Sequence, residues 1–151
     1  MTSISVENES GIACDTEALL RVAQFVMQTL RLHDESELAI TLVDVERMTE
    51  LHIEFMDEPG PTDVLSFPMD ELRIPEPDAA AEPGILGDIV LCPEFARTQA
   101  AERGRTLDAE LVFLVVHGIL HLVGFDHATQ EEYDDMFSRQ DELLAQWGSA
   151  S

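Results

Sequence analysis

Residues 117 to 127 read HGILHLVGFDH, directly after a strongly apolar run, and no other segment constrains the fold as tightly. Three of the chain's five histidines, His117, His121 and His127, lie here. Residues four apart share one face of a helix, so the rings of His117 and His121 can reach one ion. Gly124 can end that helix in a left-handed conformation and turn the chain back, which brings His127 to the same point. The sequence therefore predicts a metal site at the end of a buried helix.

The donor set favours a catalytic metal. Three imidazole nitrogens at about 2.0–2.1 Å leave one tetrahedral position open, as in catalytic zinc sites. Neutral imidazole also suits copper, nickel and iron, so the identity of the metal is less fixed than the site. A single histidine on an apolar helix is usually a core residue, and two at this spacing are ambiguous. Three, with a glycine at position 124, favour a metal site.

The spacing HxxxHxxGxxH matches the metzincin pattern HExxHxxGxxH, which predicts a zincin-like metal helix. The glutamate that serves those proteases as general base is replaced by Gly118, which cannot transfer a proton. Gly118 either lets a group approach the metal closely or lets helices pack. Asp126 is the nearest acid, and we expect it to accept the second ring N–H of a ligand histidine and fix its tautomer. The alternative is a solvated aspartate in a turn.

Hydrophobic periodicity predicts an α+β (mixed α/β) fold, with a single small mixed sheet of about four strands packed by about five helices. The length of 151 residues fits one domain spanning 1–151. A stretch rich in proline, alanine and acid, 71–84, is expected to be a surface loop. Strands are expected at 2–6 (an edge strand), 37–43, 60–68 and 86–92, and helices after Asp15 or Thr16, after Asp44, at Pro93, after Thr106 or Asp108, and at Thr129.

Charge limits the possible partners. Eight basic residues, all arginines, stand against 31 acidic ones, which gives a formal net charge of −23. Such a field repels nucleic acids and membrane surfaces unless a local feature overrides it. The two cysteines are far apart and form no C-x-x-C pair, and we read no secretory signal and no membrane span. These observations favour a reducing, cytoplasmic setting.

The histidine motif, taken with PTDVLSFP at 61–68 and LGDIVLC at 86–92, resembles the YbeY family. Its pattern H-G-x-L-H-L-x-G-[YF]-D-H is matched at every fixed position. The resemblance implies a small mixed sheet with a metal cleft and a single zinc on His117, His121 and His127. It also implies cleavage of single-stranded RNA, maturation of the 16S rRNA 3′ end and ribosome quality control in the cytoplasm. The implied partners are rRNA and the small ribosomal subunit, without DNA or membrane.

The chain departs from the family pattern at one position. Many members carry an arginine shortly before PTDVLSFP, where this chain has Met56 among acids. An arginine there would suit phosphate contact, so the way in which RNA is held is in question. The other arginines that could contact phosphate are Arg73, Arg97, Arg103 and Arg105. The last three lie on one expected helix and the loop after it, where they could form a local positive patch or pair with the plentiful acids.

Several roles stay open in the sequence. Asp63 and Asp126 are the candidate general bases, and Ser66 and Phe67 are expected to line the substrate cleft. Two other functions compete with RNA cleavage: a zinc metallohydrolase of peptide or amide substrates, and a non-catalytic ribosome-assembly factor with a structural metal. The acidic surface also predicts docking of the basic proteins of the small ribosomal subunit.

Overall fold

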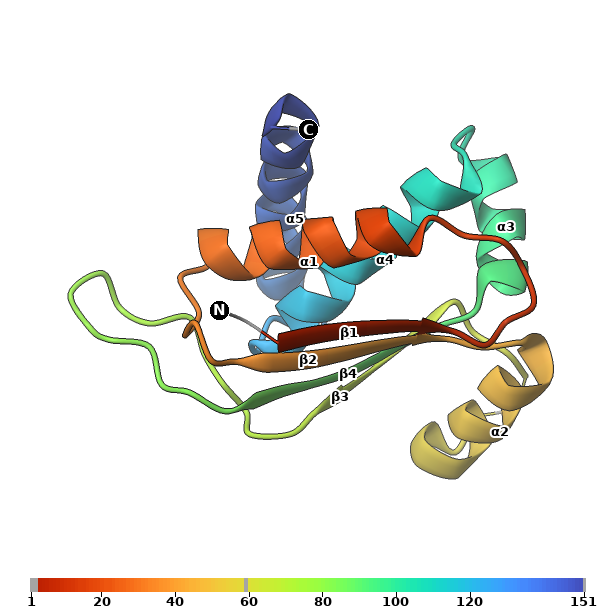
Figure 1. Cartoon of the computed structure of the whole chain (residues 1–151), viewed down its shortest axis with the longest axis horizontal. Helices are drawn as coiled ribbons and strands as arrows, with labels where there is room; N and C mark the ends of the chain where they lie inside the picture. The colour runs from red at the N-terminus through yellow and green to blue at the C-terminus, as the bar shows by residue number, and fades with distance from the viewer. Residues whose placement is uncertain (1–2, 59, 151) are drawn as a thin grey trace.

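The computed structural model describes residues 3–58 and 60–150, and within them five helices pack on one four-stranded sheet (Figure 1). The strand order is β1-β2-β4-β3. The first three strands in that order are parallel, and β3 runs antiparallel to β4 at the edge. The expected α+β fold with a small mixed sheet is confirmed. The strands are β1 (Ser3–Asn8), β2 (Glu37–Leu42), β3 (Val64–Pro68) and β4 (Ile85–Leu91); the helices are α1 (Thr16–Thr29), α2 (Val45–Met56), α3 (Pro93–Glu102), α4 (Leu107–Leu122) and α5 (Gln130–Ala150).

Four of the five helices begin at a side-chain cap that the sequence predicted. The side chains of Asp15, Asp44 and Thr106 each accept the backbone N–H three residues on, at 2.8–3.1 Å. Thr129 and Glu132 exchange side-chain to backbone hydrogen bonds in both directions, which is a capping box. Each cap satisfies a donor that the first helical turn leaves free, so the helix starts are fixed locally.

The two faces of the sheet are covered unequally. Helices α1 and α4 lie over one face, while α2 lies on the opposite side (Figure 1). Alternate residues of β2 (Leu38, Ile40 and Leu42) point into the larger core under α1 and α4. A smaller cluster, which includes Met48 and Val90, joins α2 to the other face. No helix in the described ranges is both long and apolar enough to cross a bilayer.

Helix α4 runs through the main core and stops beside the sheet edge formed by β3. Nine of its 16 residues are buried. Its end is a Schellman motif: the N–H of Gly124 donates to the carbonyl of His121, and that of Phe125 to the carbonyl of Leu120, both at 3.0 Å. Gly124 has φ +104°, a conformation that side chains disfavour. The predicted turn at Gly124 is confirmed. The chain folds back there, so that His127 lies beside the last turns of α4.

Candidate metal centre

The end of α4 brings the three predicted histidines together. His117 and His121 lie one turn apart on α4, and His127 follows the turn at Gly124. The three rings offer nitrogens that all lie within 4.8 Å of one another. The Nε2 atoms of His117 and His121 are 3.1 Å apart, and two ligands of one tetrahedral zinc lie roughly 3.3 Å apart. The donors therefore fit a divalent ion with three protein ligands.

Burial sets the protonation of these rings. His117 and His121 are partly buried, whereas His127 is exposed. Burial, with a smaller contribution from the neighbouring His117 and His127, lowers the pKa of His121 to about 4, and Asp126 opposes the shift. Burial also lowers the pKa of His117, against the effect of its hydrogen bond to Gln140. Both rings are therefore neutral at neutral pH, which is the form that binds a metal.

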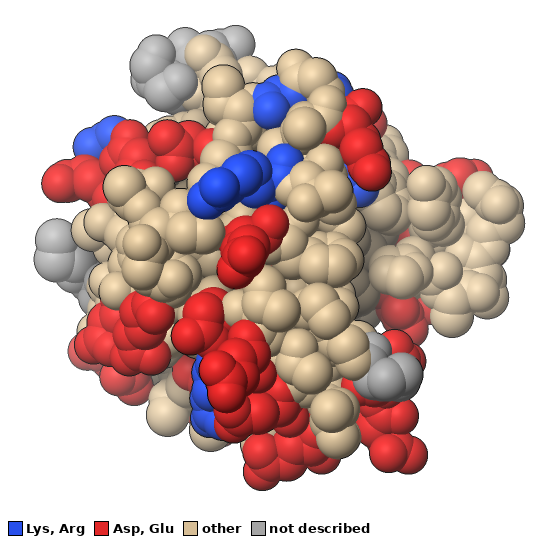
Figure 2. Space-filling view, turned by 90° about the vertical axis from the view of Figure 1, so that its right-hand side faces the viewer, with Lys and Arg blue, Asp and Glu red and all other residues tan. Residues whose placement is uncertain are grey.

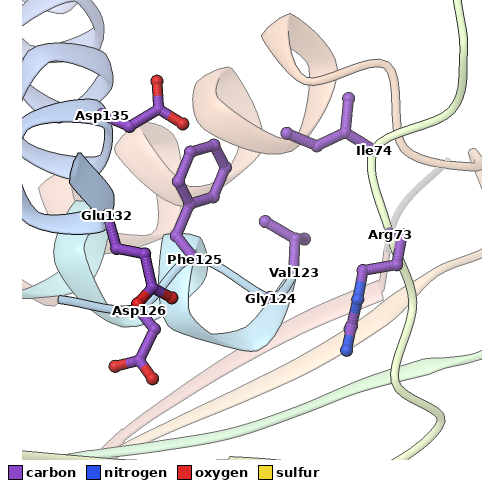
Figure 3. A pocket seen from close by; sticks show the side chains of 8 residues that line it. All are labelled: Arg73, Ile74, Val123, Gly124, Phe125, Asp126, Glu132 and Asp135. Carbon is purple, nitrogen blue, oxygen red and sulfur yellow. The ribbon is translucent and has the colours of Figure 1, made fainter. Parts of the chain in front are cut away.

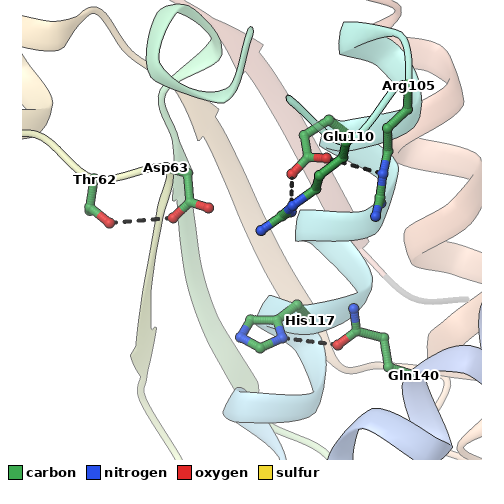
Figure 4. Close-up of polar contacts among 7 residues, drawn as sticks. Thr62, Asp63, Arg105, Glu110, His117 and Gln140 are labelled. Atoms are coloured by element: carbon green, nitrogen blue, oxygen red, sulfur yellow. Dashed lines mark hydrogen bonds and ion pairs between the residues drawn. The ribbon is translucent and has the colours of Figure 1, made fainter. Parts of the chain in front are cut away.

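Gln140 of α5 orients the first ligand, and sequence reasoning missed it. Its Oε1 lies 2.9 Å from Nδ1 of His117, and the residue is fully buried (Figure 4). When Nδ1–H donates to this oxygen, the lone pair of Nε2 is free to face an ion. The available signal was a polar residue on the apolar stripe of α5, between Met136 and Leu143.

Asp126 contacts the backbone rather than a ring. Its Oδ1 accepts the backbone N–H of His127 at 2.8 Å. Within residues 3–58 and 60–150, no hydrogen bond joins Asp126 to a histidine ring, so the expected contact is not found. Asp126 therefore holds the turn that carries His127. Asp63, the other candidate base, precedes β3 and faces α4 (Figure 4), and its charge raises the pKa of His117. The general base is assigned to neither.

A hollow of about 490 Å³ opens beside the histidines, and β3 forms one of its walls. Ser66 lines it, as expected. The prediction for Phe67 is wrong, because successive side chains of a strand point to opposite faces. Phe67 lies on the α2 side of the sheet, where its ring contacts Phe55 at a centroid distance of 5.2 Å. Met56, at the position where many family members carry arginine, does line the hollow.

Gly118 is a packing residue. A Cβ atom there would lie 2.9 Å from Cδ1 of Ile89 and 3.2 Å from Oγ of Ser66. Its absence lets α4 lie directly on β3 and β4. Of the two roles left open for Gly118, the structure favours packing, here between helix and sheet, because a side chain at this position would have to displace the fully buried side chain of Ile89.

Two of the patch arginines are already paired. Arg103 and Arg105 flank the buried carboxylate of Glu110, at 2.6 Å and 3.4 Å, and both lie over the ring of Phe113. On the face seen in Figure 2, arginines form small blue patches among more numerous acids. Arg97 is exposed and has no ion pair within the described ranges. The interpretation of paired surface arginines thus holds for Arg103 and Arg105.

Comparison with known proteins places the chain in a family. A sequence model of the family described as Endoribonuclease YbeY matches residues 4–148. The chain belongs to the YbeY family. A relative from Thermobifida fusca named Endoribonuclease YbeY is 54% identical over 145 residues, covering 96% of this chain and 94% of the relative. One of the same name from Micrococcus luteus is 51% identical over 144 residues, covering 95% and 91%.

A solved structure agrees with the fold. The solution structure of TM1509 from Thermotoga maritima matches with a TM-score of 0.61 at 26% identity. The match covers 97% of this chain and 93% of that one. The YbeY resemblance that the motifs carried is therefore confirmed over nearly the whole chain, including the N-terminal third, where the motifs are absent.

Proposed function

We propose that this chain is a zinc-dependent endoribonuclease that cleaves single-stranded RNA in the cytoplasm, in maturation of the 16S rRNA 3′ end and in ribosome quality control. The observation that carries the proposal is the convergence of three histidine nitrogens within 4.8 Å at a surface hollow. It occurs in a chain whose relatives are named Endoribonuclease YbeY.

The site's residues divide the work. A zinc ion held there would supply a Lewis acid and a positive charge against the reacting phosphate. His117 and His121 contribute neutral rings whose lone pairs face one point, and Gln140 fixes the orientation of His117. Exposed His127 completes the set from the side of the turn. The hollow beside β3 gives an extended strand room to lie against Ser66.

The net charge of the chain explains why a bound metal ion would matter for RNA binding. A net charge of −23 opposes the approach of any polyanion. A divalent ion is the largest local positive charge that such a surface can offer. We therefore expect RNA binding to depend on the metal itself and to be weak in the metal-free protein.

The competing functions fit the site less well. Peptide hydrolysis of the metzincin kind needs a carboxylate at position 118, where this chain has Gly118 packed closely against Ile89. A purely structural zinc usually has four protein ligands in a closed site. Among the residues that the structure describes, three side chains converge here, and one of them is exposed. Experiment must still decide on the assembly-factor alternative, because Met56 lines the hollow at the position where many family members carry an arginine.

The direct test combines metal content with RNA cleavage. We expect one zinc per purified chain and cleavage of a single-stranded 16S 3′-end substrate that a chelator abolishes. His121→Ala should lose both, with cleavage down by more than about 100-fold. His33→Ala, which changes a histidine outside the site, is the matched control and should behave as wild type. A folded, zinc-loaded wild type that leaves this RNA intact would contradict the proposal and favour the structural metal.

The partners follow from charge as well. We propose that basic proteins of the small ribosomal subunit dock on the acidic surface and deliver the RNA. Binding to purified small subunits should weaken as salt rises, since such contacts are screened. Equal binding at low and high salt would argue against docking by charge.

A further inference from the structure

Arg73 lies against the turn that ends α4, next to the proposed metal site. A Cβ atom at Gly124 would be 2.7 Å from Nε and 2.9 Å from Cζ of Arg73. The guanidinium therefore rests on the bare backbone of Gly124, three residues after His121 (Figure 3). Only glycine allows this approach, in addition to the positive φ that the turn requires.

The loop that carries Arg73 is anchored on both sides of it. Leu72 and Ile74 pack against the main core, so the residue between them points outward. Further along, the guanidinium of Arg31 donates to the carbonyls of Pro75 and Pro77 at 2.7 Å and 3.3 Å. Arg73 is thus held in place by the fold, although its segment contains no helix or strand.

Arg73 also has donors to spare. Its NH1 donates to the carbonyl of Leu72 at 3.0 Å. In the described part of the chain it forms no ion pair, although acidic residues outnumber basic ones 31 to 8. Three carboxylates line the same hollow, but they lie across Gly124 and Phe125 from it (Figure 3). They belong to Asp126, Glu132 and Asp135.

The hollow beside Arg73 adjoins the hollow at the proposed metal centre. It shares Gly124, Phe125 and Asp126 with the hollow that contains the three histidines. A guanidinium presents a rigid fork of donors that matches two phosphate oxygens at once. A phosphate on Arg73 would therefore lie next to the one at the metal, while the carboxylates on the α5 side repel the strand.

We propose that Arg73 binds the backbone phosphate next to the one that is cleaved. This contact positions the RNA strand across the proposed metal centre. The proposal rests on the proposed function and deepens it. Arg73 is a positioning residue, because it holds a neighbouring phosphate rather than the reacting atoms. Gly124 has no side chain, which leaves room for the guanidinium of Arg73 to lie against the backbone.

Equilibrium binding provides the first test. The zinc-loaded protein is titrated into a fluorescein-labelled single-stranded oligoribonucleotide at several salt concentrations, with anisotropy as the readout. Arg73→Gln should weaken binding about 10-fold and reduce the slope of log K against log salt by about 0.7, the loss of one single-strand phosphate contact. Arg97→Gln makes the same charge change at an exposed position of α3 and should leave the slope unchanged. Equal behaviour of the two variants, or no RNA binding by wild type, would overturn the proposal.

Cleavage kinetics and a rescue variant complete the design. Arg73→Gln should raise KM about 10-fold and change kcat less than about 2-fold, as expected for lost uniform binding. Met56→Arg, placed on Arg73→Gln, adds a cation to the same metal hollow and should recover part of the binding and the salt slope. A kcat loss with unchanged KM would contradict positioning. If wild type binds RNA through Arg73 but does not cleave it, the proposed function fails while this inference stands.

Discussion

Helix α4 carries two polar clusters, one near each end, and they are built in opposite ways. Near its start, the carboxylate of Glu110 is fully buried and is enclosed by Arg103 and Arg105. At its end, His117 and His121 direct nitrogens toward each other and toward exposed His127. The first cluster contains both signs of charge, whereas the second contains three histidine rings, two of which are kept neutral by burial.

The difference separates a structural cluster from the proposed functional one. A buried carboxylate must be compensated, and two guanidinium groups over Phe113 do this within the protein. In the second cluster the Nε2 atoms of His117 and His121 lie 3.1 Å apart, so in the metal-free chain one neutral ring can donate an N–H to the other, and a bound metal would replace that hydrogen bond. The charges of the first cluster are balanced within the folded chain, and the second offers the donor set of the proposed metal site.

Removing both arginines should have the largest effect on stability. Arg103→Ala with Arg105→Ala leaves Glu110 buried and uncompensated, at a cost of about 3–5 kcal/mol in the free energy of unfolding. Urea denaturation measures this cost. Adding Glu110→Met to the double variant removes the stranded charge and should recover much of the loss. A cost below about 1 kcal/mol for the double variant would mean that Glu110 reaches solvent.

The open cluster should respond to metal instead. Zinc at 100 times its dissociation constant should raise the free energy of unfolding by about 2.7 kcal/mol, because it binds only the folded chain. His121→Ala should abolish this gain and leave the metal-free stability within about 1 kcal/mol of wild type. Thermal unfolding with and without zinc checks both. Equal zinc stabilisation of Arg103→Ala protein is expected, since the two clusters are independent.

Gln140 should tune the open cluster without being a ligand. Gln140→Leu removes the acceptor for Nδ1 of His117 and should weaken zinc binding about 10–100-fold, measured by competition with a chromogenic chelator. Metal-free stability should change little, because the Nε2 of Gln140 is buried without a partner and leucine has no such need. Gln99→Leu, on α3, is the matched control. Comparable zinc affinity in both variants would remove Gln140 from the site.

The features that could be predicted from the sequence are those that depend on neighbouring residues. Helix caps, the turn at Gly124 and the histidine spacing all depend on residues close in the chain, and the structure places them as expected. Contacts between distant segments could not be read in the same way. Gln140 reaches His117 across 23 residues, and Asp126 bonds to a backbone N–H instead of a ring. Phe67 was misplaced because the alternation along β3 is known only once one residue is anchored.

The junction between α4 and the sheet offers the smallest and most exacting test. Gly118→Ala gains about 1 kcal/mol in helix propensity but places a methyl group 2.9 Å from Cδ1 of Ile89, which is fully buried. Overpacking of this kind costs about 1–3 kcal/mol, so we expect a net loss of about 1 kcal/mol by urea denaturation. Ile89→Val removes the clashing methyl, and the double variant should be more stable than Ile89→Val alone. Such a reversal of sign is expected only if the two side chains compete for one space. If Gly118→Ala instead stabilises the chain by itself, α4 has room on the sheet, and packing does not explain why glycine stands where proteases have their glutamate.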